Sequence, residues 1–128
     1  MENQKSAIGL DANLTAAIGY PVGLLALIMI FMEKDNKFIR FHAIQSLIWG
    51  VGCGVLFVVV IIIGMILGGV LLMASPTLGT LVWGLTGLLY LVLILGCLGG
   101  VVMGAVKAFG NEMYKLPVVG NLAEKWSA

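Results

Sequence analysis

The residues of this chain best suited to chemistry gather at the start of its longest apolar stretch. Five polar or reactive side chains follow the i, i+3, i+4, i+7, i+11 spacing that places them on one helix face: His42, Gln45, Ser46, Trp49 and Cys53. Their neighbours are mostly Val, Ile and Gly, so this polar column must face protein or water rather than lipid. One interpretation is a ligand, proton or substrate site in which His42 is the titrating group.

The alternative interpretation, which we favour, is structural. His42 and Gln45 would then hydrogen-bond backbone carbonyls of the first apolar segment or of the C-terminal tail. A histidine without a second histidine, a carboxylate or a thiolate beside it makes a poor metal site. The sequence therefore predicts no metal site, no cofactor and no catalytic residues, and we expect a protein that is not an enzyme.

Charge is distributed very unevenly along the chain. Residues 33–46 hold five of the thirteen formally charged side chains, and none follows between Phe41 and Val106. The chain is 61% hydrophobic and 10% charged, whereas soluble domains carry roughly 25% charged residues. This pattern predicts one all-α membrane domain over residues 1–128 with the lipid bilayer as its first partner. No basic face suggests a nucleic-acid partner.

Three apolar segments are long enough to predict transmembrane helices, at about residues 12–32, 46–73 and 81–106. Pro21 should kink the first of them, because proline removes one helical hydrogen bond. The turn between the second and third is expected at residues 74–80, where Ser, Pro, Thr and Gly occur. Residues 107–128 predict an amphipathic tail lying on the membrane surface, with a short helix from Leu122.

The basic residues predict an orientation for these three spans. Six of the seven lie in the hinge, residues 33–45, or in the tail, and the seventh is Lys5. Cytoplasmic loops are enriched in Lys and Arg, so hinge and C-terminus should be cytoplasmic and the N-terminus outside. We expect a multi-pass protein of the plasma or inner membrane, with Lys37 and Arg40 contacting lipid headgroups.

Small residues recur at the four-residue spacing that lets membrane helices approach closely. We expect helix packing at Gly50, Gly54, Gly64, Gly68, Gly96, Gly100 and Gly104. Three spans cannot pack against one another at every one of these glycine faces. The remaining faces favour association with further copies or with other membrane subunits. Cys53 and Cys97 fall at a similar depth, so a disulfide is conceivable. A reducing compartment and burial favour small packing residues instead.

The hinge sequence Glu-Lys-Asp-Asn-Lys-Phe-Ile-Arg-Phe-His-Ala-Ile-Gln-Ser, residues 33–46, resembles a signature of small prokaryotic membrane proteins. That family is related to the Tic-twenty component of the chloroplast inner-envelope import machinery. The tail sequence from Tyr114 to Glu124 and the Gly-Tyr-Pro turn of the first segment are similar to it as well. The resemblance implies a helical membrane protein linked to protein translocation. It carries no catalytic or cofactor residues.

Together these observations predict a small, non-enzymatic membrane protein that acts by helix association. It would be a homo-oligomer or an accessory subunit of a membrane complex, with a part in protein or solute translocation. The alternative is an oligomeric pore or small-solute transporter, in which His42, Gln45 and Ser46 line a vestibule.

Overall fold

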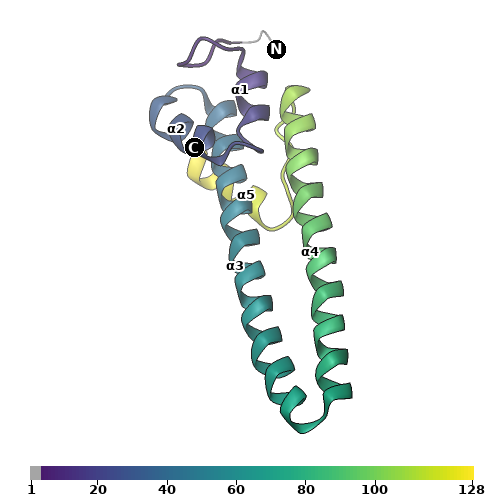
Figure 1. The fold of residues 1–128 in the computed structure, drawn as a ribbon. Coiled ribbons are helices and arrows are strands. Elements are labelled where there is room, and N and C mark those ends of the chain that lie inside the picture. Colours follow the sequence, from purple (N-terminus) through teal and green to yellow (C-terminus); the bar gives the residue numbers. More distant parts are fainter. Residues whose placement is uncertain (1–3) are drawn as a thin grey trace. The chain divides into compact units, whose positions relative to one another are not determined.

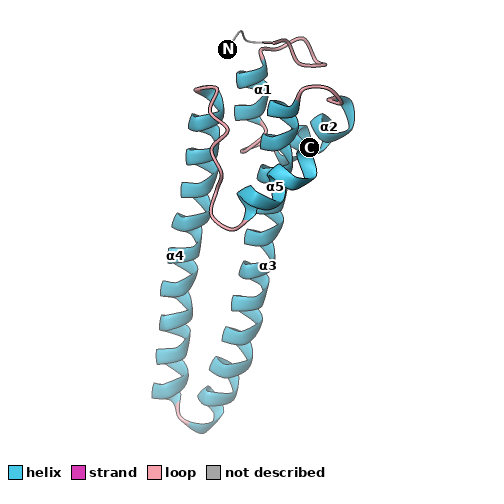
Figure 2. Cartoon of the chain, turned by 180° about the vertical axis from the view of Figure 1, so that it is seen from behind, coloured by secondary structure: helices cyan, strands magenta, loops and turns pink. Residues whose placement is uncertain are grey.

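The computed structural model describes residues 4–128, and this part of the chain folds into five helices (Figures 1 and 2). They are α1 (Ala12–Ile18), α2 (Gly23–Met32), α3 (Lys37–Ala74), α4 (Pro76–Phe109) and α5 (Val119–Ser127). The prediction of an all-helical chain is confirmed. Two of the helices, α3 and α4, are long and apolar enough to cross a membrane.

The prediction of three membrane-spanning helices is not supported, because the first apolar segment is broken. Residues 12–32 form the seven-residue α1 and the ten-residue α2, with a turn at Gly19–Val22 between them. Pro21 has no N–H to donate, and in a regular helix its ring would clash with the carbonyl of Ala17. At ~1.5 Å per residue, neither piece reaches across a ~30 Å hydrocarbon core.

The two ends of this broken segment meet. The backbone N–H of Ala7 donates to the Glu33 carboxylate, across 26 residues of sequence. Ala12 at the start of α1 packs in one cluster with Met29 near the end of α2. A straight helix would hold these ends far apart, so the expected N-terminus on the opposite side from the hinge is not supported either.

The two long helices are longer than their predicted spans. α3 begins at Lys37 rather than Ser46, where Asn36 Oδ1 accepts from the Ile39 N–H at 3.2 Å and caps the first turn. The expected turn over residues 74–80 shrinks to Ser75, because Pro76 opens α4 directly. Proline suits the first turn of a helix, where its missing N–H has no intrahelical acceptor.

The chain divides into two compact units: Met1–Gly50 with Leu98–Ala128, called the polar unit below, and Val51–Cys97, called the hairpin unit. Three clusters fill the polar unit. The first joins α1 and α2 to Ile39 and Ala43 of α3. The second brings Tyr20 against Ala108 and Leu116, and the third sets Ala123 of α5 against α3.

The hairpin unit consists of antiparallel α3 and α4 segments that pack through glycines. A side chain at Gly64 would collide with Thr86, and one at Gly68 with Trp83, so these two glycines are needed for close approach. Phe57 and Tyr90 add an aromatic contact with ring centroids 5.0 Å apart. Gly64 and Gly68, two of the glycines predicted to pack, thus lie at contacts between α3 and α4.

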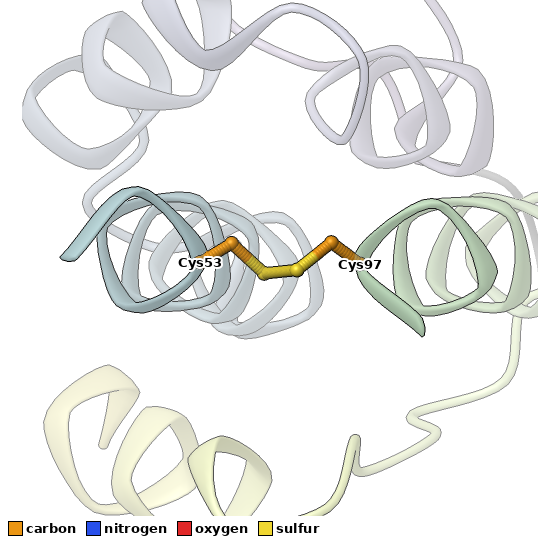
Figure 3. Close-up of a disulfide and its surroundings, with 2 residues drawn as sticks. All are labelled: Cys53 and Cys97. Atoms are coloured by element: carbon orange, nitrogen blue, oxygen red, sulfur yellow. A yellow bond between two sulfur atoms is a disulfide. The ribbon is translucent and has the colours of Figure 1, made fainter. Parts of the chain in front are cut away.

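Cys53 and Cys97 form a disulfide that joins the two helices of the hairpin unit (Figure 3). Their Cα atoms are 6.2 Å apart, inside the range that a disulfide bridges. The interpretation of these cysteines as unlinked packing residues is therefore wrong. The similar depth that the sequence indicates for the two cysteines is consistent with this bond.

Candidate functional site

The polar column predicted on α3 lies in the polar unit, and its histidine is completely buried. His42 has 0% exposure and uses both ring nitrogens. Nδ1 lies 2.9 Å from the Tyr20 hydroxyl, and Nε2 lies 3.0 Å from the backbone carbonyl of Glu112. One histidine thus connects the turn between α1 and α2 with the tail.

These contacts fix the tautomer of His42. A carbonyl oxygen only accepts, so Nε2 must carry the proton that points to Glu112. Nδ1 of the neutral ring then accepts from the Tyr20 O–H. A second proton on Nδ1 would leave the Tyr20 hydroxyl proton without this acceptor. The arrangement therefore holds the neutral imidazole.

Gln45 lies one turn further along α3 and is also 0% exposed. Its Nε2 donates to the Tyr20 hydroxyl at 2.6 Å and to the Tyr114 carbonyl at 3.0 Å. Its Oε1 accepts from the Leu116 N–H at 2.9 Å. Three of the four hydrogen bonds open to an amide are made, two of them to the backbone of the tail.

Tyr20 completes this network, which we call the staple: Tyr20, His42 and Gln45. The tyrosine accepts from Gln45, donates to His42 and is 6% exposed. Burial raises the pKa of the Tyr20 phenol to about 12, partly offset by the hydrogen bond from Gln45. Tyr20 was not among the predicted site residues and entered only as part of the Gly-Tyr-Pro turn. The available signal was a hydroxyl-bearing side chain beside Pro21 in an otherwise apolar segment.

Aromatic rings enclose the imidazole. Phe38, Phe41 and Tyr20 surround His42 with ring centroids 4.7, 5.0 and 5.8 Å away, all at edge-on angles. Such a setting excludes water, and a buried polar group left without its partner costs about 1–3 kcal/mol. The geometry therefore supports the structural interpretation: the staple fastens two segments to α3.

The rest of the predicted column does not join the staple. The Ser46 hydroxyl bonds back to the Ala43 carbonyl at 2.9 Å, within its own helix. Trp49 lies against Gly100 of α4, where any side chain would collide with the indole. Gly104 receives the Tyr20 ring in the same way. Gly100 and Gly104 thus lie against aromatic side chains, whereas Gly50, Gly54 and Gly96 face open space.

The predicted headgroup residues lie on the first turns of α3. Lys37 is exposed, and Arg40 is half-buried with its Nη1 at 3.4 Å from the Lys34 carbonyl. Among the described residues, neither forms an ion pair, whereas Lys107 pairs with Glu112 and Lys115 with Glu124. The described residues also contain no group of three or more His, Cys, Asp or Glu arranged to hold a metal ion.

Two long apolar helices, joined to a unit closed by a buried polar staple, define a small helical membrane protein. Comparison with known sequences agrees. Residues 3–123 match the magnetosome magnetite crystal formation protein family (MamF/MmsF), and the chain belongs to this family.

Its relatives include archaeal proteins named as UPF0132 membrane proteins. One from Methanocaldococcus jannaschii is 32% identical over 96% of this chain and 94% of its own length. One from Archaeoglobus fulgidus is 32% identical over 88% of this chain and 92% of its length. A second Methanocaldococcus jannaschii protein is 30% identical over 94% of this chain and 73% of its length. No solved structure matches the chain significantly. The chain is thus a member of a family of small membrane proteins whose function is not established.

Proposed function

We propose that this protein is a non-enzymatic membrane component that acts by helix association, as a homo-oligomer or as an accessory subunit of a membrane complex. The observation that carries the proposal is an open apolar groove of about 440 Å³ on the hairpin unit. It is lined by Ile61, Trp83, Thr86, Gly87, Tyr90, Leu91 and Ile94.

Tyr90 makes this groove more than a lipid-facing surface. Its hydroxyl has no hydrogen-bond partner anywhere in residues 4–128, although its ring contacts Phe57. Tyr90 lies 14 residues after Pro76 and 17 before Lys107, roughly 21 and 26 Å along the helix, so it falls inside the hydrocarbon layer. No water reaches that depth to satisfy a hydroxyl. A partner helix is the natural source of the missing bond.

A second copy of this chain meets the requirement directly. Inserted in the same direction, it carries its own Tyr90 and Thr86 at the same depth. Gly87, with open space around it, lets the two backbones come close beside the tyrosine. The absence of Asp, Glu, Lys and Arg between Phe41 and Val106 supports a non-enzymatic role for this surface.

Two glycine variants test the association. Gly87→Leu fills the groove, whereas Gly84→Leu adds the same side chain at an open position outside it. Native mass spectrometry in mild detergent should show wild type and Gly84→Leu as oligomers, or with a bound partner, and Gly87→Leu as a monomer. A wild-type protein that is strictly monomeric would contradict the proposal.

Orientation belongs to the same proposal. With two spans, both termini and the hinge lie on one side, and all seven basic residues lie outside the segment from Phe41 to Val106. We therefore place both termini in the cytoplasm of a bacterial or archaeal cell. Single cysteines at Leu78 and Asn121 should label from opposite sides. A cysteine at Gln4 should be labelled from the same side of the membrane as one at Asn121. A chain with three spans would instead place Gln4 on the same side as Leu78.

A part in translocation rests on the resemblance to Tic-twenty, which none of the similarities above tests. The family to which the chain belongs is named for magnetite crystal formation. A role in assembling membrane complexes is compatible with magnetite crystal formation and with translocation. The pore alternative needs the staple to open, because His42 and Gln45 are 0% exposed and hydrogen-bonded to the tail. His42→Ala would change solute flux in reconstituted vesicles if a pore exists. Loss of folding without a flux change supports the structural role.

A further inference from the structure

The polar unit contains two apolar elbows, each of which turns back on itself and exposes its tip. The first elbow is residues 12–32, and at its tip Val22 and Leu24 are 44% and 68% exposed. The second is residues 110–127, and at its tip Val118 is 93% exposed. Figures 1 and 2 show this second elbow running back along the end of α4 before α5 begins.

The staple sets how far the first elbow reaches. Tyr20, next to its tip, bonds to His42 and Gln45, which are five and eight residues after Lys37, about 8 and 12 Å along α3. On α4, the Tyr20 ring sits at Gly104, five residues or about 8 Å before Phe109. The tip thus lies roughly 10 Å inward from Lys37 and Phe109, the outer ends of the two long helices.

The second elbow reaches the same level. The Tyr114 carbonyl and the Leu116 N–H both bind Gln45. The chain then reverses at Val118, where φ is 68° and the Val119 N–H bonds to the Pro117 carbonyl at 2.8 Å, a tight γ-turn. α5 leads back, with Ala123 packed in one cluster with Phe41 and Ile44.

This level corresponds to the surface layer of a bilayer. Gln45 and Ala74 are 29 residues apart on α3, about 44 Å of helix, and a bilayer with its headgroups is ~40–45 Å thick. When the Ser75 turn lies in one headgroup layer, Gln45 lies in the other. The elbow tips point from there toward the acyl chains.

The exposed faces of the elbows have the composition of a membrane-surface helix. Val118 and, within α5, Leu122 and Trp126 are exposed four residues apart, and α2 exposes Leu24 and Phe31, the latter at 73%. Basic side chains lie near the outer ends of both elbows, at Lys34, Lys37 and Lys125. In a lipid leaflet the exposed apolar side chains would contact acyl chains, while the lysines would contact the phosphates of the headgroups.

We propose that both elbows are re-entrant and enter one leaflet, with their tips at the boundary between headgroups and acyl chains. The occupant of their exposed faces is lipid. The first apolar segment is then a half-inserted loop rather than a third span, and the staple sets its depth. This surface is separate from the groove of the hairpin unit, so it stands whether or not the protein oligomerises.

Spin labels on the full chain in lipid vesicles test this. Cys53 and Cys97 are bonded to each other, so a cysteine at Val22 or Val118 is the free thiol among the described residues. The matched control is Leu10→Cys, exposed to 39% before the first elbow begins. Labels at 22 and 118 should be several-fold more accessible to oxygen, relative to a water-soluble nickel complex, than the label at 10.

Labels at 22 and 118 that match position 10 would overturn the proposal. So would labels shielded from both reagents, which indicate a protein partner. If a cysteine variant does not fold, Val118→Trp provides the same reading. The fluorescence it adds to that of the three native tryptophans, taken as the difference from wild type, should be quenched more by lipids brominated near the headgroup than by lipids brominated near the chain end. An added signal that neither lipid quenches would contradict insertion.

Discussion

The Tyr20 hydroxyl and His42 Nδ1 lie 2.9 Å apart, although Tyr20 lies in the turn between α1 and α2 and His42 lies on α3, 22 residues further along the sequence. Gln45 donates to the same hydroxyl, so Tyr20 is the point at which the first elbow is fastened to α3. His42 and Gln45 in turn hold the backbone of the tail. The stability of the polar unit should therefore depend on each member of the staple.

Tyr20→Phe should lower the free energy of unfolding by about 1–3 kcal/mol, because it leaves His42 Nδ1 and one Gln45 N–H buried without partners. The matched control is Tyr114→Phe, since Tyr114 is 36% exposed and contributes its carbonyl rather than its hydroxyl. Thermal unfolding in detergent compares the two. Equal effects at both positions would contradict the staple.

Gln45→Ala should release the tail while α3 and α4 stay intact. The variant removes the acceptor of the Leu116 N–H and the donor to the Tyr114 carbonyl. Hydrogen exchange should become faster at Leu116 and its neighbours, by tenfold or more if about 1.4 kcal/mol of protection is lost. Ser46→Ala, whose hydroxyl bonds only within α3, should leave exchange in the tail unchanged.

The apolar helices could be predicted from the sequence, because hydropathy is a local property and the 65 uncharged residues between Phe41 and Lys107 leave few alternatives. The same local reading failed for residues 12–32, whose composition suits a span. What breaks that segment is local, at Pro21. What folds it back is a set of distant partners, Glu33 for Ala7 and His42 for Tyr20.

The candidate site was predicted in part for the same reason. Helical spacing predicted that His42 and Gln45 are neighbours that need protein or water beside them, and both bond to the tail. It could not separate them from Ser46, whose hydroxyl bonds within α3, or from Trp49, which packs against the cluster that contains Tyr20 and Leu116. The disulfide was missed for a different reason: depth indicated the pair, but the assumed reducing compartment argued against the bond.

Alkaline pH should weaken the polar unit through Tyr20. The pKa of its phenol is about 12 in the folded chain, above the ordinary value near 10. The folded state therefore retains a proton that the unfolded state loses. This contribution is complete below pH 10 and is lost as the pH rises toward 12. Stability measured from pH 8 to 12 should converge for wild type and Tyr20→Phe, and a constant difference would contradict this assignment.

Glycine at position 104 should be essential where glycine at position 99 is not. A methyl group at Gly104 meets the Tyr20 ring, which the staple prevents from moving aside, whereas Gly99 has open space around it. Overpacking of this kind costs about 1–3 kcal/mol, so Gly104→Ala should lower the unfolding temperature. Gly99→Ala should leave it unchanged or raise it slightly, since alanine favours the helix.

In the Tyr20→Ala background the ring is absent, and the penalty of Gly104→Ala should disappear. A penalty that persists there would show that Gly104 is required for another contact and that Tyr20 does not occupy this position.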